Sequence, residues 1–166
     1  EMNEVTLKYK KIDGSWTNNI KRELFGGAQV SAVLPYDPIK KEIVLIQQFR
    51  PGTISKNFNN FLYEIVAGII DKGESAETTA KRECIEETGC EIKNILPIQG
   101  YFPAPGSSES FYHLFLGEVE AFKGSRSMGL ESENEDILVE CYNFKKVKQM
   151  LQNKEIVNGI TLIALQ

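Results

Sequence analysis

Three glutamates within five residues form the densest group of potentially reactive side chains in the sequence: Glu83, Glu86 and Glu87. Spacings of three and four residues place their carboxylates within one sector of about 100° on a helical wheel. Like charges at this spacing repel, and a bound divalent cation would reverse that repulsion. Clustered carboxylates without His or Cys suit hard ions such as Mg²⁺ or Mn²⁺.

These three residues taken alone are more often a solvated acidic helix face, so the surrounding sequence has to decide between the two interpretations. Ala76 and Ala80 fall on the same sector of the wheel as Glu83 and Glu87. Their small side chains would let another backbone segment come close to the carboxylates, which is an unusual place for a solvated charge cluster.

The helix that carries these glutamates is the clearest element in the sequence. Ser75 to Thr88 contains good helix formers without Gly or Pro, and Gly89 follows at a plausible C′ position. Weaker helical patterns cover Phe144 to Asn153 and Ile160 to Gln166, and we expect loops at Lys56 to Asn60 and Ala121 to Asn134. Alternating or β-branched runs predict strands at Val5–Ile12, Gln29–Leu34, Glu42–Phe49, Phe61–Val66, Phe111–Val119 and Ile137–Phe144.

Strands interleaved with few helices predict an α/β (α+β) fold in which helices cover a mixed sheet. The 166 residues, 42% hydrophobic and 25% charged, fit one globular domain. We see no apolar run near the roughly 20 residues of a membrane span and no secretory signal, so we expect a cytoplasmic protein without a membrane partner. The net charge of −4 argues against nucleic acid as a partner.

The cysteine and histidine content narrows the possible chemistry. Cys84, Cys90 and Cys141 are odd in number and lack C-x-x-C spacing, which indicates reduced thiols rather than disulfides or a zinc knuckle. His113 is the single histidine, so a multi-histidine metal site is excluded. A Ser/His/Asp triad stays open. Any metal must be held mainly by oxygen.

A longer motif surrounds the three glutamates. Gly68, Glu74, Arg82, Glu83, Glu86, Glu87 and Gly89 have the spacing of the Nudix box, G-x5-E-x7-R-E-U-x-E-E-x-G-U, with Cys84 and Cys90 where the family usually has an aliphatic residue. All seven fixed positions match, so the chain resembles the Nudix hydrolases. The resemblance implies the Nudix fold, in which a mixed sheet is sandwiched between helices.

The resemblance also implies roles for the residues of the box. Glu83 and Glu87 would be the principal metal ligands, Glu86 would assist through metal or water, and the backbone carbonyl of Ala67 would face the metal. Two or three Mg²⁺ ions, or Mn²⁺, would occupy the site. Arg82 would pair with Glu74 and orient the loop and the helix, although such a pair is also a common surface ion pair.

Segments outside the box resemble bacterial ADP-ribose pyrophosphatases: 44–50, 63–68, 105–109, 132–137 and 162–166. Pro105 lies 16 positions after Gly89, as in that subgroup. In this resemblance Pro105, Gly106 and Glu109 belong to the substrate loop, which is one residue shorter than in the best-known examples, and Glu109 would contact the terminal ribose. Arg50 would approach the diphosphate, since a guanidinium suits phosphate geometry. It could equally be an ordinary surface residue.

The acidic run from Glu131 to Asp136 completes the implied site. Glu133 aligns with the glutamate that acts as general base in this subgroup, and Glu135 would serve a further metal. Without the resemblance the run would be interpreted as a solvated loop.

The resemblance implies Mg²⁺-dependent hydrolysis of ADP-ribose to AMP and ribose 5-phosphate. Two alternatives remain: a pyrophosphatase for another nucleotide sugar such as GDP-mannose, and a non-catalytic nucleotide-binding Nudix module.

We expect one Nudix domain over residues 1–166, with an N-terminal antiparallel strand region at 1–27 and the core at 28–166. The resemblance implies a homodimer in which the N-terminal strands pack across the partner and help to form the adenosine pocket. The amphipathic segment Val5 to Ile12 is compatible with this arrangement, and it could equally complete the sheet of its own subunit.

Overall fold

The computed structural model describes residues 2–56, 59–130, 132 and 134–166. Its strands are β1 Met2–Leu7, β2 Ile20–Phe25, β3 Gln29–Asp37, β4 Glu42–Phe49, β5 Phe61–Glu64, β6 Val66–Ile69, β7 Asn94–Tyr101, β8 Phe111–Glu118, β9 Ser125–Met128 and β10 Ile137–Asn143. Its helices are the 3₁₀ helix η1 Pro51–Lys56 and the α-helices α1 Ala76–Thr88, α2 Phe144–Gln152 and α3 Gly159–Ala164.

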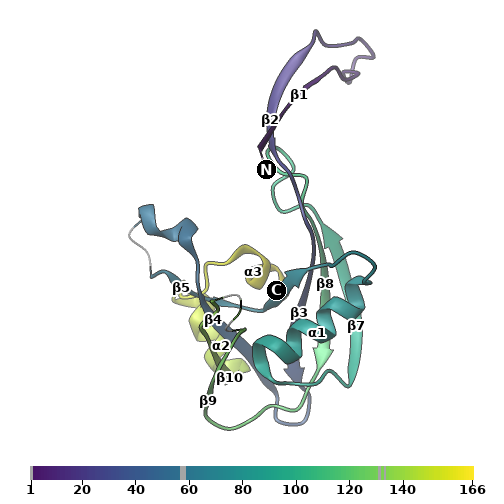
Figure 1. The fold of residues 1–166 in the computed structure, drawn as a ribbon. Coiled ribbons are helices and arrows are strands. Elements are labelled where there is room, and N and C mark those ends of the chain that lie inside the picture. Colours follow the sequence, from purple (N-terminus) through teal and green to yellow (C-terminus); the bar gives the residue numbers. More distant parts are fainter. Residues whose placement is uncertain (1, 57–58, 131, 133) are drawn as a thin grey trace.

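Eight strands of the described residues form one mixed sheet, in the order β7-β8-β3-β4-β10-β9, with β5 paired to β4 and β6 paired to β3. Strands β3 and β8 are parallel, and the other pairs are antiparallel. Strands β1 and β2 form a separate antiparallel sheet that projects away from the rest of the molecule (Figure 1). The predicted mixed α/β fold with an N-terminal antiparallel region is confirmed.

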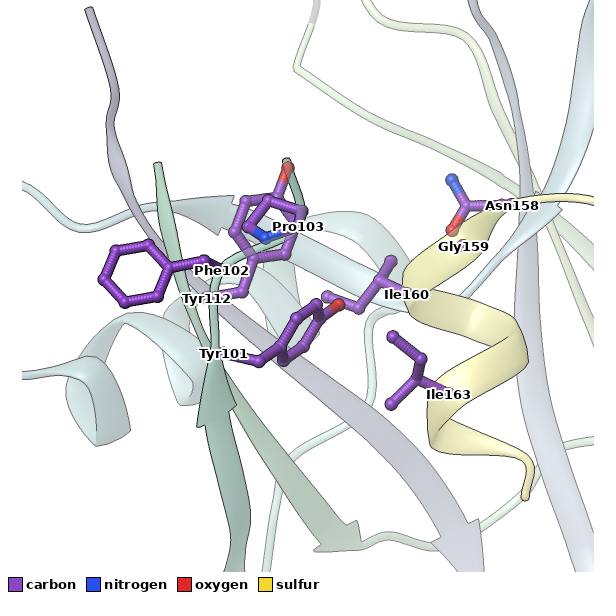
Figure 2. Close-up of a pocket in the computed structure, with 8 residues that line it drawn as sticks. All are labelled: Tyr101, Phe102, Pro103, Tyr112, Asn158, Gly159, Ile160 and Ile163. Carbon is purple, nitrogen blue, oxygen red and sulfur yellow. The ribbon is translucent and has the colours of Figure 1, made fainter. Parts of the chain in front are cut away.

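The sheet is covered on both faces, as strand β4 illustrates. Val44 and Ile46 belong to a core with Ala80 and Cys84 of α1. The intervening Ile43 and Leu45 belong to a second core with Val147 and Met150 of α2 and Ile160 of α3. Because successive side chains of a strand point to opposite faces, α1 covers one face and α2 with α3 cover the other. Figure 2 shows Ile160 and Ile163 of α3 facing Tyr101 and Tyr112 across a pocket.

The helices and most strands follow the predicted segments, but several details differ. Strand β1 ends at Leu7 rather than continuing to Ile12. The predicted strand 61–66 is divided at Ile65 into β5 and β6. Strands β2 and β7 were not predicted, and β9 lies inside the predicted loop 121–134. The loop predicted at 56–60 falls partly outside the described residues, and its first residue ends η1.

No helix in the described part of the chain has the length and apolarity needed to cross a bilayer.

Asp37 ties the turn after β3 to the chain that follows β8. One carboxylate oxygen accepts from the N–H groups of Ile39 (2.8 Å) and Lys40 (2.9 Å), and the other accepts from Ala121 N–H (2.9 Å). Asp37 is 3% exposed. The hydrogen bond from Lys40, followed by the other backbone bonds, lowers the pKa of this carboxyl despite its burial. The ionised form is therefore the one that stabilises the fold.

We expect Asp37→Ala to lower the free energy of unfolding by about 3 kcal/mol, because it leaves buried N–H groups without an acceptor. Urea denaturation at neutral pH measures this change. The difference in the free energy of unfolding between the wild type and Asp37→Ala should shrink as the pH falls through the folded-state pKa of Asp37. The stabilising carboxylate of the wild type is then protonated. Asp13→Ala, which removes a carboxylate from an exposed turn, is the control. Equal stability of the two variants would contradict the assignment.

Candidate active site

The glutamate-bearing helix α1 has defined ends. Ser75 is its N-cap, and the Ser75 hydroxyl accepts from Thr78 N–H at 3.1 Å. Gly89 follows in the left-handed region (φ 67°), and its N–H donates to Ile85 C=O at 2.8 Å. A side chain would be strained in this conformation, so glycine stops the helix here. The predicted helix and its C-terminal glycine are confirmed.

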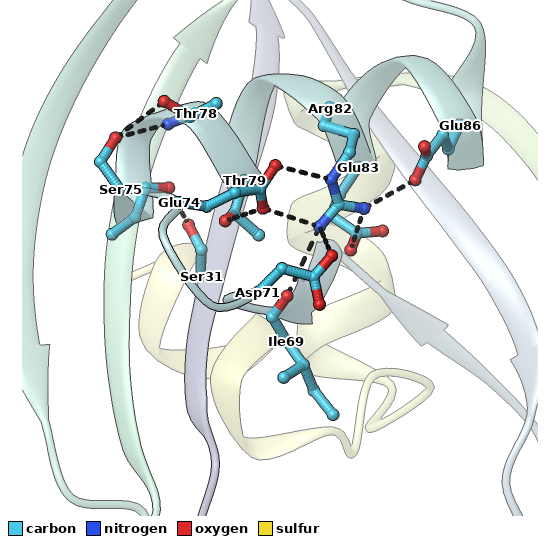
Figure 3. A network of polar contacts seen from close by, with 11 residues as sticks. Ser31, Ile69, Asp71, Glu74, Ser75, Thr78, Thr79, Arg82, Glu83 and Glu86 are labelled. Atoms are coloured by element: carbon cyan, nitrogen blue, oxygen red, sulfur yellow. Dashed lines mark hydrogen bonds and ion pairs between the residues drawn. The ribbon is translucent and has the colours of Figure 1, made fainter.

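Arg82 is the centre of a polar network that joins the loop before α1 to the helix (Figure 3). Its Nε and Nη2 donate to the two carboxylate oxygens of Glu74 at 3.2 and 3.1 Å. Its Nη1 donates to Glu83 and Glu86, at 2.8 Å each. The Arg82 hydrogen bonds are the largest cause of the lowered pKa of Glu74. This is a four-residue network rather than an isolated surface ion pair.

Gly68 lies directly beneath Glu83. A Cβ atom built at Gly68 would lie 1.8 Å from Glu83 Oε1, well inside van der Waals contact. Gly68 belongs to β6, which pairs with β3 at the register Ser31↔Gly68, so its backbone is fixed by the sheet. The glycine is therefore required for close approach of the Glu83 carboxylate to the backbone of β6.

Glu87 is the most deeply buried carboxylate of the helix, with 3% exposure. Its Oε2 accepts from Ala67 N–H at 3.3 Å. Removal from water raises the pKa of Glu87 to about 9, and the neighbouring charge of Glu83 adds to the shift. Burial also raises the pKa of Glu83, against the opposing effect of Arg82. An ionised pair of this kind is costly unless a cation compensates it.

Glu135 is brought to these two carboxylates from the segment before β10. Its charge contributes to the raised pKa of both Glu83 and Glu87. Its Oε1 accepts from Gln48 Nε2 at 3.0 Å, and its Oε2 accepts from Leu130 N–H at 3.3 Å. Glu135 therefore lies within electrostatic range of two predicted metal ligands, Glu83 and Glu87.

The residues present suit a hard divalent cation. The donors are carboxylate oxygens, one of them buried and destabilised as an anion, and the buried Gln48 Oε1 has no hydrogen-bond partner among the described residues. In that part of the chain no three acidic, Cys or His side chains converge as a preformed ion site. Glu83 and Glu86 instead turn toward Arg82.

Arg50 lies beside the same site rather than on an isolated surface. Its Nε and Nη2 donate to the two oxygens of Glu64 at 2.9 and 2.8 Å, and Glu64 is 2% exposed. The charges of Glu87 and Glu135 also act on Arg50. Arg50 and Glu64 line a pocket of about 280 Å³ together with Val30, Ala67, Gly68, Ile69, Tyr112, Asn158 and Ile160.

A second pocket continues from the first. It has a volume of about 330 Å³ and is lined by Tyr101, Phe102, Pro103, Tyr112, Asn158, Gly159, Ile160 and Ile163 (Figure 2). Three of these residues, Tyr112, Asn158 and Ile160, also line the Arg50 pocket. The linings of the two pockets together reach from Gly68 of β6 to Tyr101 at the end of β7.

The remaining predicted site residues lie elsewhere or outside the described chain. Pro105, Gly106 and Glu109 are exposed in the β7–β8 loop. That loop contacts the end of β2: Phe25 N–H donates to Ser107 C=O, and Glu109 N–H donates to Phe25 C=O. Within the described residues Glu109 makes no hydrogen bond or ion pair with the α1 carboxylates. Glu133 is outside the described residues.

Two residues near the site, Gln48 and Glu64, were not predicted, although each is a polar residue in an otherwise apolar strand segment. Gln48 is polar at a position where the alternation of Val44 and Ile46 calls for an apolar side chain. Glu64 is an acidic residue inside the apolar strand segment 61–66. A charged or amide side chain in a core-facing strand position needs a partner, and here the partners are Glu135 and Arg50.

Residues 27–159 match the model of the NUDIX domain family, so the chain belongs to the Nudix family. It is a Nudix hydrolase, as the sequence predicts.

Individual relatives narrow the similarity within the family. The chain is 35% identical to the ADP-ribose pyrophosphatase of Escherichia coli (strain K12), over 96% of this chain and 77% of that one. It is 33% identical to the ADP-ribose pyrophosphatase of Haemophilus influenzae, over 99% and 77% of the two chains. It is also 30% identical to the GDP-mannose pyrophosphatase of Klebsiella pneumoniae, over 99% and 82%.

The fold has a solved counterpart in the crystal structure of an ADP compounds hydrolase. The TM-score is 0.71 at 16% sequence identity, with 99% of this chain and 82% of that chain covered. At this identity the likeness concerns the fold alone.

Proposed function

We propose that this protein hydrolyses the pyrophosphate bond of ADP-ribose, giving AMP and ribose 5-phosphate, in a Mg²⁺-dependent reaction. The observation that carries the proposal is the buried carboxylate of Glu87, whose pKa is raised by burial and by the neighbouring charges of Glu83 and Glu135. Similarity to ADP-ribose pyrophosphatases over nearly the whole chain supports the choice of substrate.

Glu83, Glu87 and Glu135 would hold two or three Mg²⁺ ions, or Mn²⁺, with help from Glu86 and the Ala67 carbonyl. When bound, these ions neutralise charge on the diphosphate and polarise the phosphorus that is attacked. Arg82 holds Glu83 and Glu86 from the side and fixes the helix to the Glu74 loop. Arg82 would thereby orient the loop and the helix.

Arg50 would bind the diphosphate. Glu64 accepts hydrogen bonds from Nε and Nη2 of Arg50. In the described parts of the chain Nη1 has no hydrogen-bond partner. The planar guanidinium can therefore present Nη1 to a phosphate oxygen while Glu64 fixes its orientation. Glu133 would accept the proton of the attacking water, and Glu109 with the Pro105–Gly106 turn would contact the terminal ribose.

A second candidate substrate is another nucleotide sugar such as GDP-mannose, favoured by the 30% identity to GDP-mannose pyrophosphatases. A non-catalytic nucleotide-binding module is disfavoured, because all the fixed residues of the Nudix box are present.

A panel of substrates separates these functions. ADP-ribose, GDP-mannose, NADH and diadenosine polyphosphates are tested with Mg²⁺, with Mn²⁺ and with excess chelator, and product release is measured. We expect ADP-ribose to have the highest kcat/KM and the chelator to abolish it. Preference for GDP-mannose would move the assignment to the second candidate, and binding without release would indicate the non-catalytic module.

We also propose a homodimer built through the N-terminal arm, residues 2–25. In the described residues β1 pairs with β2 and not with the main sheet, so it does not complete the sheet of its own subunit. The arm exposes large apolar side chains: Met2, Leu7, Tyr9, Ile12, Trp16 and Phe25. Covering such side chains with a second copy would remove them from water. Sedimentation of the full chain, compared with a chain that starts at residue 26, tests this.

The second pocket should receive an organic group attached to the diphosphate, because it shares three lining residues with the Arg50 pocket. Ile163→Trp, on the outer wall, should raise KM for ADP-ribose about tenfold or more with little change in Mg²⁺ dependence. Ile39→Trp, on the exposed β3–β4 turn, is the control. Unchanged steady-state kinetics in the Ile163 variant would place the substrate outside this pocket.

A further inference from the structure

Gln48 is a polar residue at a core-facing position of strand β4. Val44 and Ile46 of the same strand face belong to the core under α1. Residue 48 is next on that face, where β4 pairs with Ile137 of β10 and Leu62 of β5. Gln48 is nevertheless 9% exposed. A buried amide in such a place is unfavourable unless both of its polar atoms find partners.

One end of the amide has a partner. Gln48 Nε2 donates to Glu135 Oε1 at 3.0 Å. An ionised carboxylate only accepts hydrogen bonds, so the amide group cannot be reversed without placing two acceptors against each other. The orientation of the amide is therefore fixed by Glu135.

The other end of the amide has none. Gln48 Oε1 is buried and has no hydrogen-bond partner among the residues that the structure describes. Oε1 and Nε2 share one carbon atom, so Oε1 also lies close to the Glu135 carboxylate. The charged groups that act on this site are Glu83, Glu86, Glu87, Glu135, Arg50 and Arg82. The four carboxylates are acceptors, Arg50 is directed to Glu64, and Arg82 is directed to Glu74, Glu83 and Glu86.

Since none of the described residues donates to Oε1, a small molecule within the site can supply the donor. Water bound to a divalent cation is such a donor, because the cation withdraws electrons from its O–H bonds. We propose that Gln48 is a positioning residue of the metal site. Its Nε2 holds Glu135, and its Oε1 accepts a hydrogen bond from a water molecule on the bound cation. This inference rests on the proposed metal-dependent function.

Gln48→Leu tests the inference, because leucine fits a core-facing strand position and removes both hydrogen-bonding atoms. Gln47→Leu is the matched control, since Gln47 is the neighbouring glutamine on the opposite face of β4. Gln48→Met, with an unbranched side chain, is a second variant. The measurements are urea denaturation without metal, Mn²⁺ binding by electron paramagnetic resonance, and kcat and KM for ADP-ribose.

We expect Gln48→Leu and Gln48→Met to be at least as stable as the wild type without metal, because an unsatisfied buried acceptor is removed. Mn²⁺ affinity should fall about 10- to 100-fold, and kcat should fall with it, while KM for ADP-ribose is unchanged. Gln47→Leu should bind Mn²⁺ like the wild type.

A purely structural role predicts the reverse pattern, with altered stability and unaltered Mn²⁺ affinity, and that result would overturn the inference. Loss of the folded state in both Gln48 variants would overturn it as well, because the amide is then needed for the metal-free fold. Failure of the wild type to bind Mn²⁺ would instead defeat the proposed function. Wild-type binding that Gln48→Leu leaves intact would defeat the Gln48 inference alone.

Discussion

Replacing Glu87 with glutamine is expected to reduce turnover by about 10³-fold or more and, at the same time, to stabilise the metal-free protein. The loss of turnover follows from the proposed role of Glu87 as a metal ligand, because a bound metal ion contributes several kcal/mol of transition-state stabilisation. The gain in stability follows from burial, since Glu87 is 3% exposed and glutamine removes a buried negative charge.

The pH dependence of stability gives this prediction a second readout. The pKa of Glu87 is raised from 4.5 to about 9 in the folded protein. Its contribution to stability is therefore fully present below pH 4.5 and is lost as the pH rises toward 9, because the unfolded chain releases this proton first. Metal-free wild type should lose stability over this range, and Glu87→Gln should lose less.

Glu77→Gln is the matched control for Glu87→Gln. Glu77 is on the same helix, but it is exposed and paired with Lys81 at 2.6 Å. We expect this variant to keep wild-type turnover and the wild-type pH profile of stability. Urea denaturation across the pH range and initial rates with Mg²⁺ measure both properties. A Glu87→Gln protein that is less stable than the wild type, or that turns over normally, would remove Glu87 from the metal site.

Glu133→Gln is expected to lower kcat by about 10²- to 10⁴-fold with little change in metal binding, since a general base contributes a factor of this size. Initial rates and Mn²⁺ titration are measured on the same preparation. Glu131→Gln makes the same change of charge in the same acidic run and should have a small effect.

Three results for Glu133→Gln can be told apart. A large fall in kcat with normal Mn²⁺ affinity supports Glu133 as the base. A parallel fall in both quantities makes Glu133 a metal ligand. Near-normal turnover moves the base to another residue.

The fold was predictable where the hydrophobic pattern is strong. Strand β4 and helix α1 were located to within a residue, because β4 is apolar on both faces and α1 has a capping serine and a terminal glycine. Strand β7 was missed because it contains Pro97 and Gly100, which normally interrupt strands. The register shift between Pro97 and Gln99 shows how the sheet accommodates the proline. Strand β2 was missed because most of its side chains are exposed.

The candidate site was predictable as far as the Nudix motif extends. Glu83 and Glu87 come from one helix, so their spacing alone brings them together. Their grouping with Glu135, by contrast, depends on the pairing of β10 with β4, a contact between residues far apart in the sequence. The role of Gln48 can be inferred only once that pairing is known. Its Nε2 then donates to Glu135, and its buried Oε1 has no partner among the described residues.

Binding of Mg²⁺ to chelator-treated protein, measured by isothermal titration calorimetry with and without AMP, tests the central claim most directly. The buried Glu87 carboxylate, with Glu83 and Glu135 acting on it, predicts binding at millimolar Mg²⁺ or below, strengthened by AMP and strongly weakened in Glu87→Gln. Absence of binding of either Mg²⁺ or Mn²⁺ at millimolar concentrations, with and without nucleotide, would contradict it.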